Sequence, residues 1–293
     1  MDPKTLSALF FTLVLWASAF AGIRAGLAGY GPGELALLRF LVASLTLAAL
    51  APFARLRLPR RADLARIAAL GFLGITVYHV ALNYGELTVS AGAASLLIAS
   101  GPVFTALLAV VFSGERLPPL GWAGIATGFV GVALIALGEG GGLRFSPGAF
   151  WIVLAAFSTS LYFVFQKPLH ARYTPFEVTA YTLWAGTVWM LPLLADLQAA
   201  LATAPAAATW SVVYLGVGPG ALAYAAWTFA LSRAPASRVT SFLYLSPALA
   251  IVIAWFWLGE WPSVLAIVGG LVAILGVFLT QRAGRAPASR GIS

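Results

Sequence analysis

Long runs of apolar residues, separated by short charged or Pro/Gly-rich breaks, fill this chain of 293 residues. Each run has about the 20 residues that a helix needs to cross a bilayer, and none alternates as the strand of a membrane barrel does. The pattern therefore predicts an all-α integral membrane protein with ten transmembrane helices. The expected helices are 5–28, 34–53, 66–85, 91–113, 119–138, 148–166, 176–195, 209–231, 239–258 and 262–281.

The composition agrees with this pattern. Hydrophobic residues make up 61% of the chain and charged residues only 9%, whereas a soluble domain carries about 25% charged residues. A soluble globular protein is therefore excluded. The chain has no cysteine and only two histidines, neither of which has a carboxylate beside it in the sequence. Disulfides and thiolate chemistry are absent, and neither a metal site nor a cofactor is predicted.

Lysine and arginine indicate the orientation, because they collect in the short cytoplasmic loops of membrane proteins. Alternate breaks hold 14 of the 17 basic residues: Lys4, Arg55, Arg57, Arg60, Arg61, Arg66, Arg116, Lys167, Arg172, Arg233, Arg238, Arg282, Arg285 and Arg290. The opposite loops hold Arg144, with Arg24 and Arg39 near the outer helix ends. Both termini are expected in the cytoplasm. The first apolar run is too long for a cleaved signal peptide, so we expect it to be retained.

The second half of the chain repeats the first. A shift of 145 residues aligns 102–115 with 247–260, and a slip of two residues aligns Pro32 with Pro175. The expected repeats are 1–140 and 141–293, each with five helices. Since five is odd, the second repeat enters the membrane in the opposite sense. Inverted repeats around a central site are typical of secondary transporters that work by alternating access.

The stretch Trp16-Ala-Ser-Ala-Phe20, the motif Pro32-Gly33-Glu34 followed by Arg39-Phe40, and the paired ends Pro102/Glu115 and Pro247/Glu260 resemble the drug/metabolite transporter superfamily in its ten-helix EamA-type branch. The resemblance covers almost the whole chain. Within this branch the chain is most similar to bacterial inner-membrane exporters of aromatic and other neutral amino acids. The resemblance implies a basket-shaped monomer whose cavity is lined by helices one, three, four, six, eight and nine, with helices five and ten at the periphery.

Polar residues inside membrane helices usually face a cavity or another helix. Thr76, His79 and Asn83 form one stripe on the third helix, and the repeat matches His79 and Asn83 with Tyr224 and Thr228. The predicted substrate-binding residues are Trp16, Phe20, Tyr78, His79, Asn83, Ser95, Ser100, Tyr162, Gln166, Tyr224, Thr228, Ser241 and Tyr244, and the predicted hinges are Pro102 and Pro247. We expect a pocket with aromatic walls and neutral donors and acceptors.

The lack of charged residues at the middle of the predicted helices limits the class of substrate. No carboxylate, lysine or arginine falls at the middle of a predicted helix, although a cationic drug would need a buried acid and a sugar phosphate would need a buried base. A neutral or zwitterionic, partly apolar metabolite remains, such as a neutral or aromatic amino acid. Export of another small metabolite or a drug is the alternative within the same class.

Two other function classes fit less well. An intramembrane hydrolase with Ser100 and His79 lacks an acid to orient the histidine, so no enzymatic activity is expected. A channel would need a continuous polar lining or a filter loop. His79 is the only titratable side chain expected at depth, and the sequence therefore predicts facilitated transport instead of proton coupling. The expected partners are the substrate and the lipid bilayer of the inner membrane, with no nucleic acid. The glycines of Gly124-x3-Gly128 and Gly131 are expected to pack within one monomer.

Overall fold

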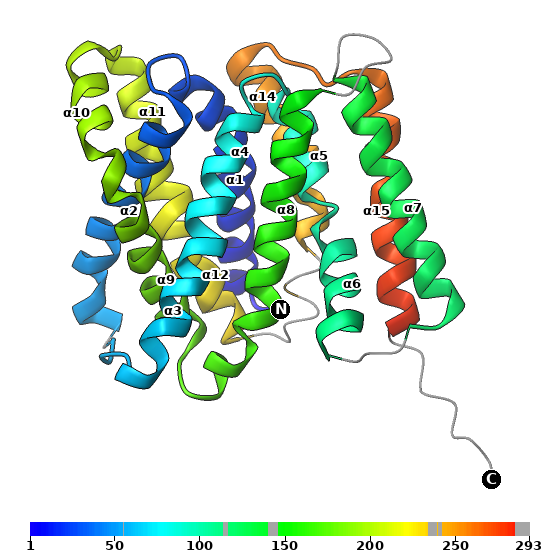
Figure 1. Ribbon diagram of the computed structural model, residues 1–293, viewed down its shortest axis with the longest axis horizontal. Coiled ribbons are helices and arrows are strands. Elements are labelled where there is room, and N and C mark those ends of the chain that lie inside the picture. The colour runs from blue at the N-terminus through cyan, green and yellow to red at the C-terminus, as the bar shows by residue number, and fades with distance from the viewer. Residues whose placement is uncertain (55, 114–116, 140–145, 234–238, 240–241, 285–293) are drawn as a thin grey trace.

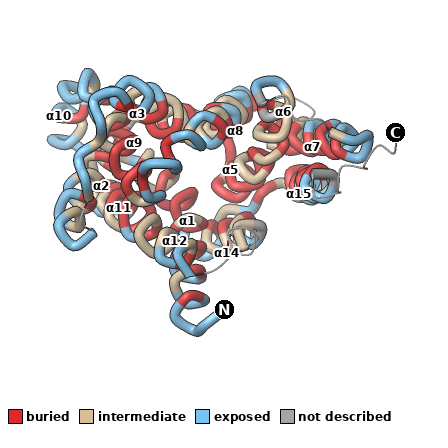
Figure 2. The backbone as a smooth tube through the Cα atoms, turned by 90° about the horizontal axis from the view of Figure 1, so that it is seen from below, coloured by how far each residue is buried: buried red, intermediate tan, exposed pale blue. Residues whose placement is uncertain are grey.

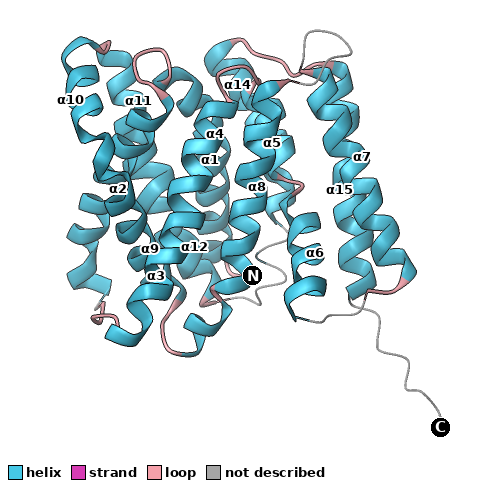
Figure 3. Cartoon of the chain, in the orientation of Figure 1, coloured by secondary structure: helices cyan, strands magenta, loops and turns pink. Residues whose placement is uncertain are grey.

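The computed structural model covers the whole chain, and the described residues are 1–54, 56–113, 117–139, 146–233, 239 and 242–284. In this part every regular element is a helix (Figure 3). The helices are α1 (Pro3–Gly26), α2 (Pro32–Ala54), α3 (Leu64–Gly71), α4 (Tyr78–Gly85), α5 (Ala91–Ile98), α6 (Gly101–Ser113), α7 (Pro119–Gly138), α8 (Pro147–Phe165), α9 (Pro175–Met190), α10 (Leu194–Thr203), α11 (Ala206–Val217), α12 (Ala223–Leu231), α14 (Ser246–Leu258) and α15 (Val264–Gly284). Short 3-10 helices cover Arg61–Asp63, Lys167–Ala171, Leu191–Leu193 and Phe242–Leu245.

Nine spans in the described residues are long and apolar enough to cross a membrane, once the segments that continue one another are joined. The expected helix 239–258 is the exception. Of it the structure describes Val239, the turn Phe242–Leu245 and α14, which has 13 residues. The multi-span helical class expected from the sequence is therefore confirmed, with nine spans in this part of the chain.

Prolines and capping residues define where many helices begin. A proline is the first residue of α1, α2, α7, α8 and α9, where its missing N–H costs nothing and its fixed φ suits a helix. The Asp2 carboxylate accepts from the backbone N–H of Thr5 at 3.0 Å. Thr174 and Glu177 form a reciprocal capping box at the start of α9. The helix starts are thus encoded locally.

Two spans are interrupted at corresponding places. A π-helical turn, Phe72–Val77, joins α3 to α4, and a second one, Gly218–Leu222, joins α11 to α12. The second turn contains Pro219, whose missing N–H breaks the regular helical ladder. Such turns often occur at functional sites. Each lies just before a predicted site residue, His79 in α4 and Tyr224 in α12.

The helices α7 and α15 lie side by side at one edge of the molecule (Figures 1 and 2). A Cβ on Gly131 would come within 2.6 Å of the Gly269 carbonyl oxygen, and one on Gly276 would come within 2.6 Å of the Gly124 carbonyl oxygen. Small residues here let the two backbones touch. The peripheral position implied for the fifth and tenth helices is confirmed, and the glycines pack within one chain as expected.

The α2–α3 and α8–α9 connections lie at the same end of the bundle, where α15 also ends (Figure 1). The former carries Arg57, Arg60 and Arg61, and the latter carries Lys167 and Arg172. The basic loops that the sequence groups together therefore meet at one end of the structure. We call this the basic end.

Candidate functional site

A polar stripe runs along α4, directly after the π-helical turn. His79 and Asn83 are one helical turn apart, and Glu86 caps the same helix three residues later. This spacing places the three side chains on one face. His79 is 6% exposed, and Asn83 and Glu86 are 0% exposed. The stripe is therefore entirely inside the protein.

Helix α2 packs against this stripe. The Asn83 Nδ2 atom donates to the Pro32 carbonyl oxygen at 2.9 Å, and the rings of Phe40 and His79 lie 4.4 Å apart. Arg39, the neighbour of Phe40, is only 4% exposed. We call Arg39, His79, Asn83 and Glu86 the polar cluster.

Several atoms of the polar cluster are buried and have no hydrogen-bond partner among the described residues. They are Nε and Nη1 of Arg39, Nδ1 of His79, Oδ1 of Asn83 and both carboxyl oxygens of Glu86. An unpaired buried polar atom costs about 1–3 kcal/mol, and more when it is charged. Buried polar groups normally have hydrogen-bond partners, so this cluster differs from the rest of the described interior.

The cluster contains one group of each charge sign. Arg39 and Glu86 form no ion pair with each other in the described part of the chain. They are nevertheless close enough for the charge of one group to influence the other. The site therefore offers separated positive and negative groups with no excess of either.

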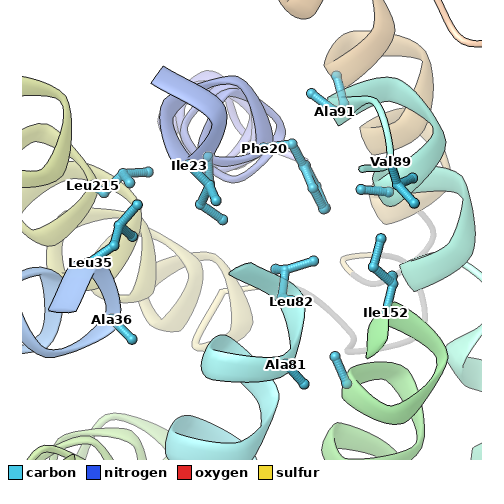
Figure 4. Packing of buried hydrophobic residues seen from close by; sticks show 14 of the residues in the cluster. Phe20, Ile23, Leu35, Ala36, Ala81, Leu82, Val89, Ala91, Ile152 and Leu215 are labelled. Carbon is cyan, nitrogen blue, oxygen red and sulfur yellow. The ribbon is translucent and has the colours of Figure 1, made fainter. Parts of the chain in front are cut away.

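Aromatic and apolar residues of α1, α8 and α12 line other parts of the interior. The Trp16 ring lies 5.2 Å from the Tyr224 ring and 5.1 Å from the Trp227 ring, and its Nε1 donates to the Pro219 carbonyl oxygen at 3.3 Å. Figure 4 shows Phe20 of α1, Leu82 of α4 and Ile152 of α8 pointing toward one another across the interior. An interior lined in this way suits an apolar side chain.

An ion pair joins the two halves of the chain beside Glu86. Arg24 on α1 donates from Nε at 3.0 Å and from Nη2 at 2.8 Å to Oε1 of Glu260, which follows α14. Its Nη1 donates to the Glu86 carbonyl oxygen at 2.5 Å. Oε2 of Glu260 accepts from the backbone N–H of Ala91 at 3.3 Å. This network joins α1, the end of α4, the start of α5 and the end of α14.

Comparison with known proteins decides the class. The model of the EamA-like transporter family matches residues 4–137 and 146–282. The chain belongs to the EamA-like transporter family. It is 48% identical to the "Probable terminal-alkyne amino-acid exporter" of Streptantibioticus cattleyicolor (strain ATCC 35852 / DSM 46488 / JCM 4925 / NBRC 14057 / NRRL 8057) over 95% of this chain and 94% of that protein. It is 45% identical to the "Uncharacterized transporter YdfC" of Bacillus subtilis (strain 168), over 91% and 87%.

A solved crystal structure with 22% sequence identity superposes on this EamA transporter with a TM-score of 0.62, covering 98% of this chain and 100% of the other. This likeness supports the fold. The suspected family is thus confirmed, and the chain is a multi-pass membrane transporter.

The EamA transporter places several predicted hydroxyls against its own backbone. Ser95 donates to the Gly92 carbonyl oxygen at 2.6 Å, Ser100 to that of Leu97 at 2.5 Å and Thr228 to that of Tyr224 at 2.8 Å. The Thr76 hydroxyl does not join the polar stripe of His79, because it donates to the Gly186 carbonyl oxygen on α9. These hydroxyls already have partners, unlike the polar cluster.

The remaining predicted residues lie beside the polar cluster, away from it, or outside the described residues. Tyr78 borders the cluster, with its ring 4.5 Å from that of His79. Tyr162 lies against α9, where its hydroxyl is 3.4 Å from that of Thr182, and Gln166 caps α8. Ser241 and the side chain of Tyr244 lie outside the described residues.

The predicted hinge prolines stand at the start of new helices. Helix α5 ends at Ile98, and Pro102 is the second residue of the next helix, α6. Pro247 is the second residue of α14, which follows a 3-10 turn. The expected continuous helix 91–113 is therefore two helices with a break at Ala99 and Ser100. A proline tolerates the first turn of a helix better than its interior, which explains the position of both breaks.

Two residues of the polar cluster correct the sequence analysis. Arg39 was placed near an outer helix end and Glu86 in a loop, yet both are buried. Neither residue lies at the middle of a predicted helix, but a helix end can be covered by its neighbours, so a position outside the middle of a helix does not imply exposure. The motif Arg39-Phe40 carried a signal, since a charged residue seven positions into an apolar run needs a polar environment.

Neither of two described pockets is the site. One, of about 750 Å³, is an apolar groove lined by the start of α1, by Phe242 and Leu245, and by α14. A groove of this composition on a membrane protein suits contact with lipid. The other, of about 390 Å³, lies between α1 and α11. Among the described residues no group of three or more His, Asp or Glu side chains is arranged to hold a metal ion.

Proposed function

We propose that this EamA transporter exports neutral amino acids, aromatic ones included, or similar zwitterionic metabolites across the bacterial inner membrane by alternating access. The polar cluster is the observation that carries the proposal. It combines a buried guanidinium with a buried carboxyl group, and these two groups complement the carboxylate and the ammonium group of a zwitterion. The aromatic rings of Trp16, Tyr78 and Tyr224 offer surface to an apolar side chain. The name of the Streptantibioticus relative agrees with this class.

The proposed architecture has ten transmembrane helices in two inverted halves, 1–140 and 141–293, with both termini in the cytoplasm. The matched π-helical turns before α4 and α12 support the repeat. The contacts between helices support it too, since α2 packs on α11 as α9 packs on α3. The collection of arginines at the basic end favours the cytoplasm for that end. We propose that one monomer forms the complete transport path.

Transport of the proposed substrates is tested with purified protein in liposomes. Vesicles loaded with unlabelled phenylalanine should take up labelled phenylalanine by counterflow, and leucine and other neutral amino acids should compete. Glucose 6-phosphate and a quaternary ammonium drug should not compete, because each carries charge of one sign only. Exchange of the sugar phosphate in the absence of any amino-acid exchange would overturn the proposal. Saturation of counterflow separates a transporter from a channel.

Membrane topology is tested with single cysteines, since the chain has none of its own. Leu58 is 93% exposed and Leu201 is 45% exposed, and the two positions correspond in the repeat, 143 residues apart. The inverted arrangement predicts that Leu58→Cys reacts with a membrane-impermeant maleimide only from the cytoplasm and Leu201→Cys only from outside. Reaction of both from one side would contradict inversion.

A further inference from the structure

Arg39 and Glu86 stand at two levels of the same interior wall. The ring contact of Phe40 with His79 and the hydrogen bond from Asn83 to the Pro32 carbonyl oxygen fix α2 and α4 side by side in opposite directions. Arg39 therefore lies near the level of His79. Glu86 is seven residues further along, and a helix rises about 1.5 Å per residue, so their backbones are separated by about 10 Å along the axis.

His79 and Asn83 stand on α4 between the levels of Arg39 and Glu86, and they also present unpartnered atoms. The His79 Nδ1 and the Asn83 Oδ1 are neutral groups, so they add hydrogen bonds without adding charge. The long side chains of Arg39 and Glu86 shorten the separation, but they stay beyond ion-pair distance of each other. Their unpartnered atoms are complementary to the two ends of a small molecule that carries both an anionic and a cationic group, because a guanidinium donates to an anion and a carboxylate accepts from a cation.

The surroundings make an ordinary structural role for the two residues improbable on energetic grounds. Elsewhere the same chain pairs its buried acids. Glu177 and Asp63, which are 3% and 5% exposed, receive Arg57 and Arg172 at 2.9 Å each. Removal of one partner from a buried charge is strongly destabilising. Two unpaired ionisable groups kept in one interior are therefore exceptional in this chain, and a ligand with complementary groups would complete them.

Resting on the proposed function, we propose that Arg39 binds the carboxylate and Glu86 the ammonium group of a free α-amino acid, so that the first half of the transporter recognises the head group shared by all substrates. The side chain then points toward the aromatic and apolar wall of Trp16, Phe20 and Tyr224. Selectivity is strict for the head group and tolerant for the side chain.

Head-group analogues test this assignment directly. Phenylalaninamide lacks the carboxylate, and N-acetylphenylalanine lacks the ammonium group. Loss of a charge-assisted partner corresponds to about a 10- to 100-fold weaker binding. In the counterflow assay both analogues should therefore compete about 10- to 100-fold more weakly than phenylalanine. Equal competition by phenylalanine and both analogues in the wild-type protein would overturn the assignment.

Two variants assign the two ends separately. Arg39→Gln should bring the ratio between phenylalaninamide and phenylalanine close to one and leave the discrimination against N-acetylphenylalanine. Glu86→Gln should do the opposite. A general structural defect would lower all rates and leave both ratios unchanged, and this result would contradict the assignment. Glu139→Gln is the matched control, because Glu139 accepts from the backbone N–H groups of Ser90 and Ser263 at 3.0 and 3.1 Å and should keep both ratios.

The outcome also separates this inference from the proposed function. Absence of exchange for every amino acid in the wild-type protein is a failure of the proposed function. Exchange of phenylalanine with unchanged ratios in Arg39→Gln and Glu86→Gln is a failure of the head-group assignment alone. Each variant is checked by gel filtration, and Arg39→Lys and Glu86→Asp replace any neutral variant that does not fold. These two keep the charge but change the reach and geometry of the side chain, so Arg39→Lys should weaken only the discrimination against phenylalaninamide and Glu86→Asp only that against N-acetylphenylalanine. Loss of the opposite ratio, or no change in either, would contradict the assignment.

Discussion

The two halves of the transporter differ most where the repeat makes them correspond. His79, Asn83 and Glu86 on α4 are replaced, 145 residues later, by Tyr224, Thr228 and Leu231 on α12. Arg39 on α2 is replaced, 143 residues later, by Thr182 on α9. The first half thus holds both charged groups at these positions, and the second half holds none.

The replacements in the second half have local partners. Thr182 donates to the Val178 carbonyl oxygen and Thr228 to that of Tyr224, both at 2.8 Å. Leu231 packs on a small apolar cluster formed by Leu9, Ala230 and Val239. The second half therefore contributes an aromatic and apolar surface. A fold with two similar halves need not bind its substrate symmetrically. The proposed head-group residues all lie in the first half, whereas the aromatic wall comes from both halves, with Trp16 and Phe20 on α1 and Tyr224 on α12.

The largest difference between the halves is expected for one matched pair of substitutions. Asn83→Leu removes a fully buried amide that bonds α2 and presents a free oxygen, so phenylalanine counterflow should fall by about 10-fold or more. Thr228→Val removes a hydroxyl that bonds only its own helix, and counterflow should change by less than about 2-fold. Initial rates at equal protein content measure both. Equal losses in the two variants would show that the halves share the site evenly.

Much of this organisation could be predicted from the sequence. Apolar runs and basic loops give the class and the helix positions, since length and hydropathy dominate the cost of membrane insertion. His79 and Asn83 were predicted because a polar residue in the middle of a run must be enclosed. Glu86 was missed because it follows the helix, and only tertiary contacts with Arg24 and α2 bury it. The sequence predicted hinges at Pro102 and Pro247 within continuous helices, whereas each proline is the second residue of a new helix, because proline suits a helix start better than a helix interior.

A second test uses pH. Glu86 follows the span Arg61–Gly85, and burial raises the pKa of its carboxyl well above the usual range. The charged groups that face it are Arg24 on α1, Glu260 after α14 and Arg39 on α2. Because the protonated form persists to higher pH, acidification should weaken phenylalanine binding, by at most about tenfold per pH unit for one proton. Glu86→Gln should bind weakly at every pH.

The sequence predicted facilitated transport because it offered no carboxylate in the interior. The buried carboxyl group of Glu86 removes that reason. If Glu86 releases a proton when the substrate ammonium binds, an imposed pH gradient should drive phenylalanine accumulation above equilibrium in the wild-type protein. Glu86→Gln should exchange phenylalanine without accumulation. His79→Ala is the control, since the sequence assigned any proton effect to His79. Accumulation that persists in Glu86→Gln and is lost in His79→Ala would show that His79, and not Glu86, carries the coupled proton.

A third test concerns the ion pair that joins the halves. Arg24 and Glu260 are 30% and 23% exposed at their side chains, so solvent screens the pair and its effect is smaller. Arg24→Gln and Glu260→Gln should each change the exchange rate by about 2- to 5-fold. The double variant should be no more affected than the stronger single variant, because both remove one interaction. Effects that multiply would show that the two residues act independently.

The smallest effect is expected in the aromatic wall. Tyr224→Phe keeps the edge contact with Trp16 and removes only a hydroxyl, so the rate for phenylalanine should change by less than about 2-fold. Trp16→Leu removes the ring that contacts both Tyr224 and Trp227 and the hydrogen bond to the Pro219 carbonyl oxygen. It should therefore lower the preference for phenylalanine over alanine by about 3-fold, since an aromatic contact is worth about 0.5–1.5 kcal/mol. Competition by the two amino acids in each variant measures this preference. A loss of head-group discrimination in Trp16→Leu, with side-chain preference unchanged, would show that the wall and the polar cluster are not separate parts of the site.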